Sequence, residues 1–155
     1  MIGRCGVAEL KVTRVSDRLT VSPQPAGDDF PSLAARGVKL VINNRPDGED
    51  PGQPTASEGV RLAAMNGMAY RHIPVRLPDL GLAEIEAFAE AVRGADGPVH
   101  AHCRSGVRSA TLWALSEVMA GRLAAPDVGS AIEAIGFDPK PAVAWLAAHA
   151  DALPK

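Results

Sequence analysis

A cysteine and an arginine stand close together in the segment HCRSGVRS, residues 102–109. A cysteine thiolate is an effective nucleophile, and a guanidinium binds oxyanions through a planar fork of N–H donors. Gly106 lies between Cys103 and Arg108 and gives the backbone the freedom that a tight turn needs. The segment therefore predicts a nucleophilic cysteine beside an anion-binding loop.

The flanking sequence indicates how this loop is held. The apolar run PVHAHC, residues 98–103, is typical of a buried strand, and SATLWALSEVMAG, residues 109–121, is typical of a helix. A loop curled between a strand and a helix turns its N–H groups inward, and the first helical turn adds positive potential. This potential favours thiolate over thiol, so Cys103 is the expected nucleophile, and its sulfur should be open to solvent. The expected anion-binding residues are Arg104, Ser105, Gly106, Val107, Arg108 and Ser109.

The rest of the chain alternates strand and helix patterns. Residues 10–22 alternate apolar and polar side chains around a Ser16-Asp17 turn, which predicts a hairpin-like pair. Two further strands are expected at 38–43 and 69–75, and helices at about 55–66, 82–94, 126–136 and 140–152. Residues 23–37 predict a turn and then a short helix, which Asp28 or Asp29 caps and Gly37 ends. This order predicts one α/β domain over residues 1–155, with a small parallel-rich central sheet flanked by helices. Its core would cover about residues 11–121, followed by C-terminal helices at about 126–152.

The segment NRPDGEDPGQP, residues 44–54, is rich in turn formers and predicts a loop. Ligands of parallel sheets bind beyond the carboxyl ends of the strands. This loop and the end of the 98–103 strand both lie at that edge, so we expect them to meet there.

Composition excludes several classes of function. The net charge is −2 and no basic stripe with interleaved aromatic residues occurs, which disfavours nucleic-acid binding. No apolar run is long enough to span a bilayer, and the N-terminus lacks a signal-peptide core, so we expect a cytoplasmic protein without membrane contact. The two cysteines match no metal-ligand spacing, and neither a metal nor a cofactor is expected. Cys5 is interpreted as inert, with a relay role as the alternative.

His102 precedes the cysteine and is interpreted as a core histidine that braces the loop, with direct proton transfer as the alternative. His100 shares its strand face. A His-Cys metal site is disfavoured because further ligands at the usual spacing are missing.

These residues resemble known families. Residues 102–109 are similar to the signature of cysteine-dependent tyrosine phosphatases and to the active loop of rhodaneses. The segment VINNRPDGEDPGQP, with VSPQP before it, is similar to the phosphatase-like domain of the beta-lactamase-hydrolase-like family, over about residues 11–121. The resemblance implies a dual-specificity-phosphatase-like fold, with Cys103 as nucleophile and Arg108 as the anion-binding arginine. It also implies that Asn44, Arg45 and Asp47 lie beside the active loop and support it.

The spacing departs from the tyrosine phosphatase pattern. Those enzymes place five residues between cysteine and arginine, whereas four stand here, as in rhodaneses. Removing one residue, which spans up to about 3.8 Å, narrows the anion cup and suits a single sulfur atom better than a phosphoryl group. Phosphoester cleavage also needs a general acid, and Asp79 lies later than the expected position. Asp79 and Asp47 are candidates, each with turn formation as the alternative role.

The sequence therefore leaves three hypotheses for the function. The first is a sulfurtransferase that carries sulfane sulfur on Cys103, takes thiosulfate or a persulfide, and acts with a persulfide dioxygenase. The alternative is a tyrosine or dual-specificity-like phosphatase that hydrolyses a phosphate ester through a phosphocysteine. The third is an anion-binding module without catalysis.

Overall fold

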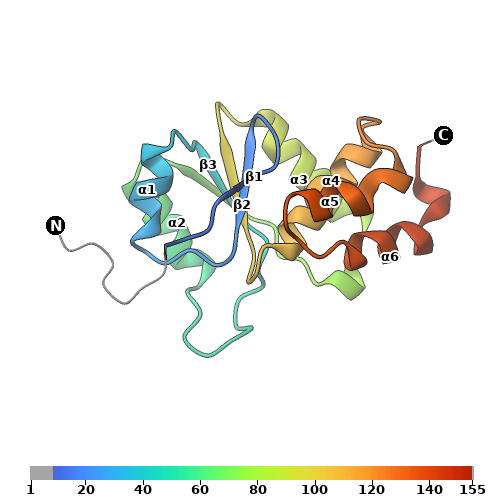
Figure 1. Ribbon diagram of the computed structural model, residues 1–155. Helices are drawn as coiled ribbons and strands as arrows, with labels where there is room; N and C mark the ends of the chain where they lie inside the picture. Colours follow the sequence, from blue (N-terminus) through green and yellow to red (C-terminus); the bar gives the residue numbers. More distant parts are fainter. Residues whose placement is uncertain (1–8, 155) are drawn as a thin grey trace.

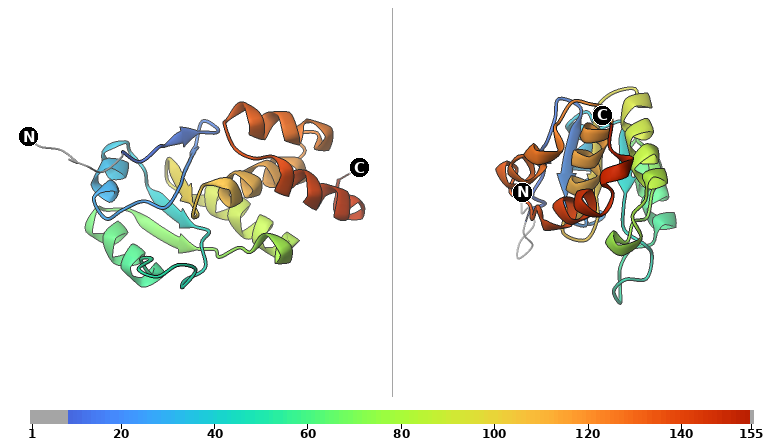
Figure 2. Two further views of the ribbon diagram at one scale, coloured as in Figure 1. Left: turned by 60° about the horizontal axis from the view of Figure 1, so that its bottom comes forward. Right: turned by 90° about the vertical axis from the view of Figure 1, so that its right-hand side faces the viewer.

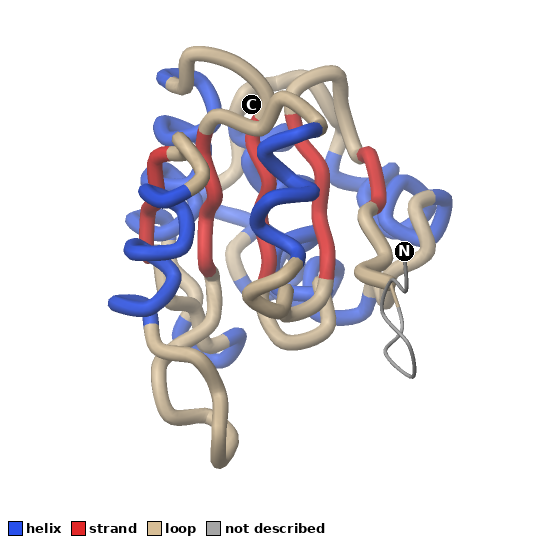
Figure 3. Tube along the Cα trace, turned by 90° about the vertical axis from the view of Figure 1, so that its left-hand side faces the viewer, coloured by secondary structure: helices blue, strands red, loops and turns tan. Residues whose placement is uncertain are grey.

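A central sheet organises the computed structural model, which describes residues 9–154. Within these residues the strands lie in the order β1-β2-β5-β3-β4, as Figure 3 shows from one side. The first pair is antiparallel, and the remaining neighbours are parallel. The strands are β1 (Thr13–Arg14), β2 (Leu19–Ser22), β3 (Leu40–Asn43), β4 (Ala69–His72) and β5 (Val99–His102). The expected α/β class with a parallel-rich sheet is confirmed.

Helices cover both faces of this sheet. Helices α1 (Asp29–Ala35) and α2 (Ala56–Met65) lie on one face, and α3 (Leu82–Gly94) and α4 (Val107–Met119) lie on the other (Figure 1). Helices α5 (Val128–Ala134) and α6 (Lys140–Ala148) pack against α4, and Figure 2 shows them at the end of the molecule away from α1. Short 3₁₀ turns occur at Leu77–Asp79, Ala125–Asp127 and Ala150–Ala152.

The strand alternation divides the core between these two layers. Val99 and Ala101 of β5 contribute to the core under α3 and α4, whereas Val41 of β3 packs with Phe30 and Leu33 of α1. All four residues of β3 and of β5 are buried, because helices cover both faces of these central strands. The end of β5, where Cys103 follows, is thus held between two packed layers.

Most element boundaries agree with the sequence pattern. Thr55 and Glu58 form the expected capping box at the start of α2. Helix α4 begins at Val107, two residues before the expected start. Strand β4 ends at His72, shorter than the expected 69–75, and Pro74 lacks the N–H that a ladder needs. Cys5 lies outside the described residues.

Candidate active site

The loop between β5 and α4 closes around the sulfur of Cys103. Gly106 precedes the helix with a φ of 101°, a left-handed conformation that favours glycine. Its N–H donates to Sγ of Cys103 at 3.0 Å. A Cβ at this position would lie 2.5 Å from Cε1 of Phe137, so the loop also has no room for a side chain there. Conformation and packing both require glycine at position 106.

Arg108 lies between the cysteine and an acidic residue of the 44–54 loop. Its Nη1 donates to Oε2 of Glu49 at 2.7 Å and to the carbonyl oxygen of Val75 at 3.0 Å, and its Nη2 donates to Oε1 of Glu49 at 2.9 Å. The hydrogen bonds to Glu49 raise the pKa of Arg108 above its ordinary value, and the neighbouring Cys103 acts in the same direction. The guanidinium therefore stays charged beside the sulfur.

Cys103 has an exposed fraction of 0%. The expectation of a thiol open to solvent is wrong for this conformation. Gly106 donates to the sulfur, and the guanidinium of Arg108 also interacts with it.

Glu49 is a site residue that sequence reasoning missed. Besides the two bonds from Arg108, its Oε1 accepts from Nε of Arg45 at 2.9 Å. The hydrogen bond from Arg108 lowers the pKa of Glu49 from 4.5 to about 2; Arg45 acts in the same direction, and burial opposes both. Glu49 is thus a carboxylate at neutral pH and cannot serve as a general acid. The signal in the sequence was an acidic pair, Glu49-Asp50, in the loop expected beside an arginine-rich one.

The two neighbouring arginines differ in burial. The side chain of Arg45 is 5% exposed and donates to Asp50 at 2.6 Å and to Gln24 at 3.2 Å, so it anchors the 44–54 loop. Arg104 is 67% exposed and pairs with Asp50 at 3.1 Å. Arg104 and the exposed Ser105 therefore lie at the rim, and Arg45 supports the site from below.

The hydroxyl of Ser109 is bonded to the loop that follows β3. It donates to Oδ1 of Asn44 at 2.7 Å, and Nδ2 of Asn44 donates to the carbonyl oxygen of Ile73 at 2.9 Å. Ser109 has one hydroxyl hydrogen, and that hydrogen is used in the bond to Asn44. The side chain of Ser109 therefore braces α4 against the end of β3, and the anion-binding role expected for Ser109 stays a prediction.

Both histidines of β5 are buried and neutral. Burial lowers the pKa of His102 to about 4 and that of His100 to about 3. Nδ1 of His102 lies 3.3 Å from the carbonyl oxygen of Cys103, which places the ring under the loop. The ring nitrogens of His100 lie 2.7 Å from the hydroxyls of Thr20 and Ser22. These contacts support the interpretation of His102 as a bracing residue.

The two candidate acids are placed differently. Oδ1 of Asp47 accepts from the N–H of Ala56 at 2.9 Å, so Asp47 fixes the start of α2. Asp79 is exposed on the 3₁₀ turn and, with Val75 and Pro46, lines a cavity of about 350 Å³. The carbonyl of Val75 accepts from Arg108, so this cavity adjoins the site. Of the two, Asp79 remains the candidate acid.

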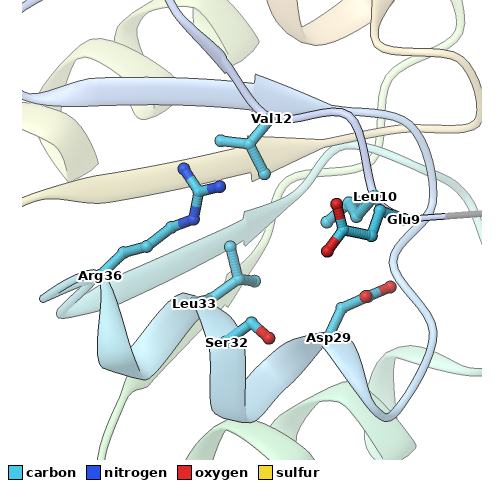
Figure 4. Close-up of a pocket in the computed structure, with 7 residues that line it drawn as sticks. All are labelled: Glu9, Leu10, Val12, Asp29, Ser32, Leu33 and Arg36. Atoms are coloured by element: carbon cyan, nitrogen blue, oxygen red, sulfur yellow. The ribbon is translucent and has the colours of Figure 1, made fainter. Parts of the chain in front are cut away.

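One pocket among the described residues lies away from this loop. The small pocket in Figure 4, of about 100 Å³, lies between the N-terminal segment and α1 and contains none of the expected site residues. Among residues 9–154 no three His, Cys, Asp or Glu side chains gather as a metal site would require. In the same range no helix has the length and apolar character needed to cross a membrane.

In this fold a cysteine follows a central strand of a parallel sheet, and an arginine lies at the start of the next helix. This arrangement defines a cysteine-phosphatase-like α/β domain. Comparison with known proteins agrees. Residues 11–120 match the family model for the phosphatase-like domain of beta-lactamase hydrolase-like proteins, so the chain belongs to this family.

A curated relative supports this family, and solved structures support the fold. A beta-lactamase hydrolase-like protein of Agrobacterium fabrum is 43% identical over 145 residues, which are 94% of this chain and 34% of the relative. The chain therefore spans about a third of that relative. A Neisseria meningitidis protein whose name places it among the phosphatases superposes with a TM-score of 0.78 at 27% identity, over 86% of this chain and 94% of that one. A similarly named protein of Shewanella putrefaciens superposes with a TM-score of 0.73 at 23% identity, over 91% of each chain.

Proposed function

We propose that the domain is a phosphoric monoester hydrolase that uses Cys103 as its nucleophile. The observation that carries the proposal is the loop itself: Sγ receives an N–H bond from Gly106, and Arg108 lies in the first turn of the helix that follows. Membership in the phosphatase-like family and the similarity to the Neisseria protein support phosphate esters as the substrate class.

The reaction proceeds in two displacements. The thiolate of Cys103 attacks phosphorus, an S–P bond forms, and the P–O bond to the leaving group breaks. Arg108 and the loop N–H groups balance the charge on the phosphoryl oxygens. Water then attacks the phosphocysteine, and inorganic phosphate leaves as the thiolate is restored.

Asp79 is the proposed general acid for the first displacement. A departing alkoxide needs a proton, and the carboxyl must come within about 3 Å of the leaving oxygen. Glu49 is held as a carboxylate, and Asp47 serves the start of α2. Asp79 is exposed on a short turn, and the structure gives its side chain no hydrogen bond or ion pair among residues 9–154. This side chain is therefore free to approach a bound ester.

Sulfur transfer is the second candidate, because four rather than five residues separate Cys103 from Arg108. In that reaction the thiolate attacks the sulfane sulfur of thiosulfate, the S–S bond breaks and sulfite departs with the electron pair. An acceptor thiolate or cyanide then removes the sulfur. No general acid is needed, and a persulfide dioxygenase is the expected partner. The comparisons support the phosphatase-like class and give this chemistry no support of its own.

A side-by-side assay separates the candidates. Wild type and Cys103→Ser are incubated with aryl phosphates and tyrosine phosphopeptides in one series, and with thiosulfate plus cyanide in the other. Phosphate release that disappears in Cys103→Ser supports the proposal. Thiocyanate formation without phosphate release would replace it with sulfur transfer. If neither product forms while phosphate still binds the loop, the domain is an anion-binding module and the proposal fails.

A further inference from the structure

The donors of Arg108 are divided between two sides of the guanidinium. The group carries five N–H bonds in a fixed plane. Three of these are used away from the nucleophile: Nη1 donates to Glu49 and Val75, and Nη2 donates to Glu49. The Nε–H and the second hydrogen of Nη2 remain. These two hydrogens are parallel and form one edge of the plane.

That remaining edge is used by neither Glu49 nor Val75. The two carboxylate oxygens of Glu49 close the neighbouring edge, and Cys103 lies five residues before Arg108 at the other end of the same loop. Two parallel donors match two oxygens of a tetrahedral oxyanion. The number of donors left over is therefore the number that a bidentate contact with such an anion requires.

Glu49 is itself held in place by a second arginine. Arg45 donates to Oε1 of Glu49, and Arg45 is itself buried and bonded to Asp50 and Gln24. The chain of contacts runs from buried Arg45 through Glu49 to Arg108. A carboxylate fixed from behind can hold the guanidinium in one orientation.

We propose that Glu49 is a positioning residue, which aims the Nε–Nη2 edge of Arg108 at the oxyanion bound on Cys103. The inference rests on the proposed function in that a substrate oxyanion binds there. Glu49 does not touch the substrate. It acts through Arg108 and sets both the affinity for the anion and the rate of the first displacement.

The test measures oxyanion affinity independently of turnover. In a Cys5→Ser background, Cys103 is alkylated with iodoacetamide, and inorganic phosphate is titrated as the protecting ligand. Glu49→Gln, which keeps the shape but loses the charge, should raise the phosphate concentration for half-protection at least tenfold. Glu49→Asp, which keeps the charge on a shorter side chain, should recover part of the loss. Glu86→Gln is the matched control, because Glu86 is exposed and has no bonded partner among residues 9–154.

A double-mutant cycle distinguishes positioning from general damage. If Glu49 acts through Arg108, Glu49→Gln should have little further effect on half-protection once Arg108→Lys is present. Full additivity of the two changes would overturn the inference, as would a Glu49→Gln titration within twofold of Glu86→Gln. Failure of phosphate to protect the wild type would overturn it as well.

Activity gives a separate readout. With an aryl phosphate, Glu49→Gln should lower kcat at least tenfold while Glu86→Gln stays at the wild-type value. If the wild type hydrolyses no phosphate ester but Glu49→Gln still weakens phosphate protection, the proposed function fails and the positioning role stands. If hydrolysis occurs and Glu49→Gln leaves both kcat and protection unchanged, the positioning role fails alone.

Discussion

The Ser109 hydroxyl donates to Oδ1 of Asn44 at 2.7 Å, and both side chains are fully buried. This bond joins the start of α4 to the end of β3. Asn44 also donates to the carbonyl oxygen of Ile73, and its backbone N–H donates to the carbonyl oxygen of His102. One asparagine therefore ties together the ends of three neighbouring strands and the helix that carries Arg108.

Ser109→Ala should lower the free energy of unfolding by about 1–3 kcal/mol, because Oδ1 of Asn44 is left buried without its donor. The measurement is urea denaturation at pH 7. Ser130→Ala is the control, since that exposed hydroxyl bonds, among residues 9–154, only to the carbonyl oxygen of Asp127 and should change stability by less than about 0.5 kcal/mol. Equal losses in the two variants would contradict the bracing role.

Gly106→Ala should abolish detectable turnover. It should also lower the free energy of unfolding by more than an alanine at a positive φ costs by itself. The added Cβ meets Phe137 at 2.5 Å, and the φ of 101° is unfavourable for alanine. Gly121→Ala measures the φ cost by itself, because Gly121 has a φ of 77° and nothing within 4 Å of its Cβ position. Adding Phe137→Ala to Gly106→Ala should recover part of the stability. No difference between Gly106→Ala and Gly121→Ala would argue against the steric contact.

Stability should fall as the pH is lowered below 6.5. His100 and His102 have folded pKa values of about 3 and about 4, below the ordinary value of 6.5, so the unfolded chain binds protons that the folded chain does not. Their contribution is complete above pH 6.5 and is lost progressively toward pH 4 and 3. Each histidine contributes at most about 1.4 kcal/mol per pH unit to the slope of the free energy of unfolding against pH. Denaturation at pH 7, 6, 5 and 4.5 measures it, and His100→Gln should reduce the slope by about half. An unchanged slope in that variant would exclude His100 as a source.

Glu49 should stabilise the fold above its ordinary pKa and lose this effect at lower pH. Its folded pKa is lowered from 4.5 to about 2, so the contribution is present above pH 4.5 and disappears as the pH falls toward 2. Solvent screening of the partly exposed pair limits this contribution to about 1 kcal/mol. The quantity to measure is the stability difference between wild type and Glu49→Gln from pH 5 to 2.5, because the histidine contributions cancel in it. A constant difference across that range would show that the charge of Glu49 is not the stabilising feature.

Asp79→Asn should slow hydrolysis according to the leaving group. For phenyl phosphate, whose phenoxide needs a proton, we expect kcat/KM to fall by about 10²–10⁴. For p-nitrophenyl phosphate, whose leaving group departs readily as an anion, the fall should be much smaller. Equal effects on both substrates would mean that Asp79 does not donate the proton.

The sequence alone predicted the parts of this protein that depend on local pattern. The apolar runs at 38–43 and 98–103 indicated buried strands because helices cover both faces of a central parallel strand, and Thr55 with Glu58 marked the start of a helix. The order of strands and helices then predicted the α/β class. The candidate loop was recognisable because a nucleophile, a turn-forming glycine and an anion-binding arginine lie within six residues: Cys103, Gly106 and Arg108.

Only the tertiary structure decided what each polar group near the loop is bonded to. Glu49 lies 59 residues from Arg108 along the chain, and no local pattern specifies that pair. The same holds for Ser109 and Asn44, 65 residues apart, and for the burial of the Cys103 sulfur. Periodicity reports which face of an element is buried, but hydrogen bonds between distant loops depend on how the packed strands bring those loops together.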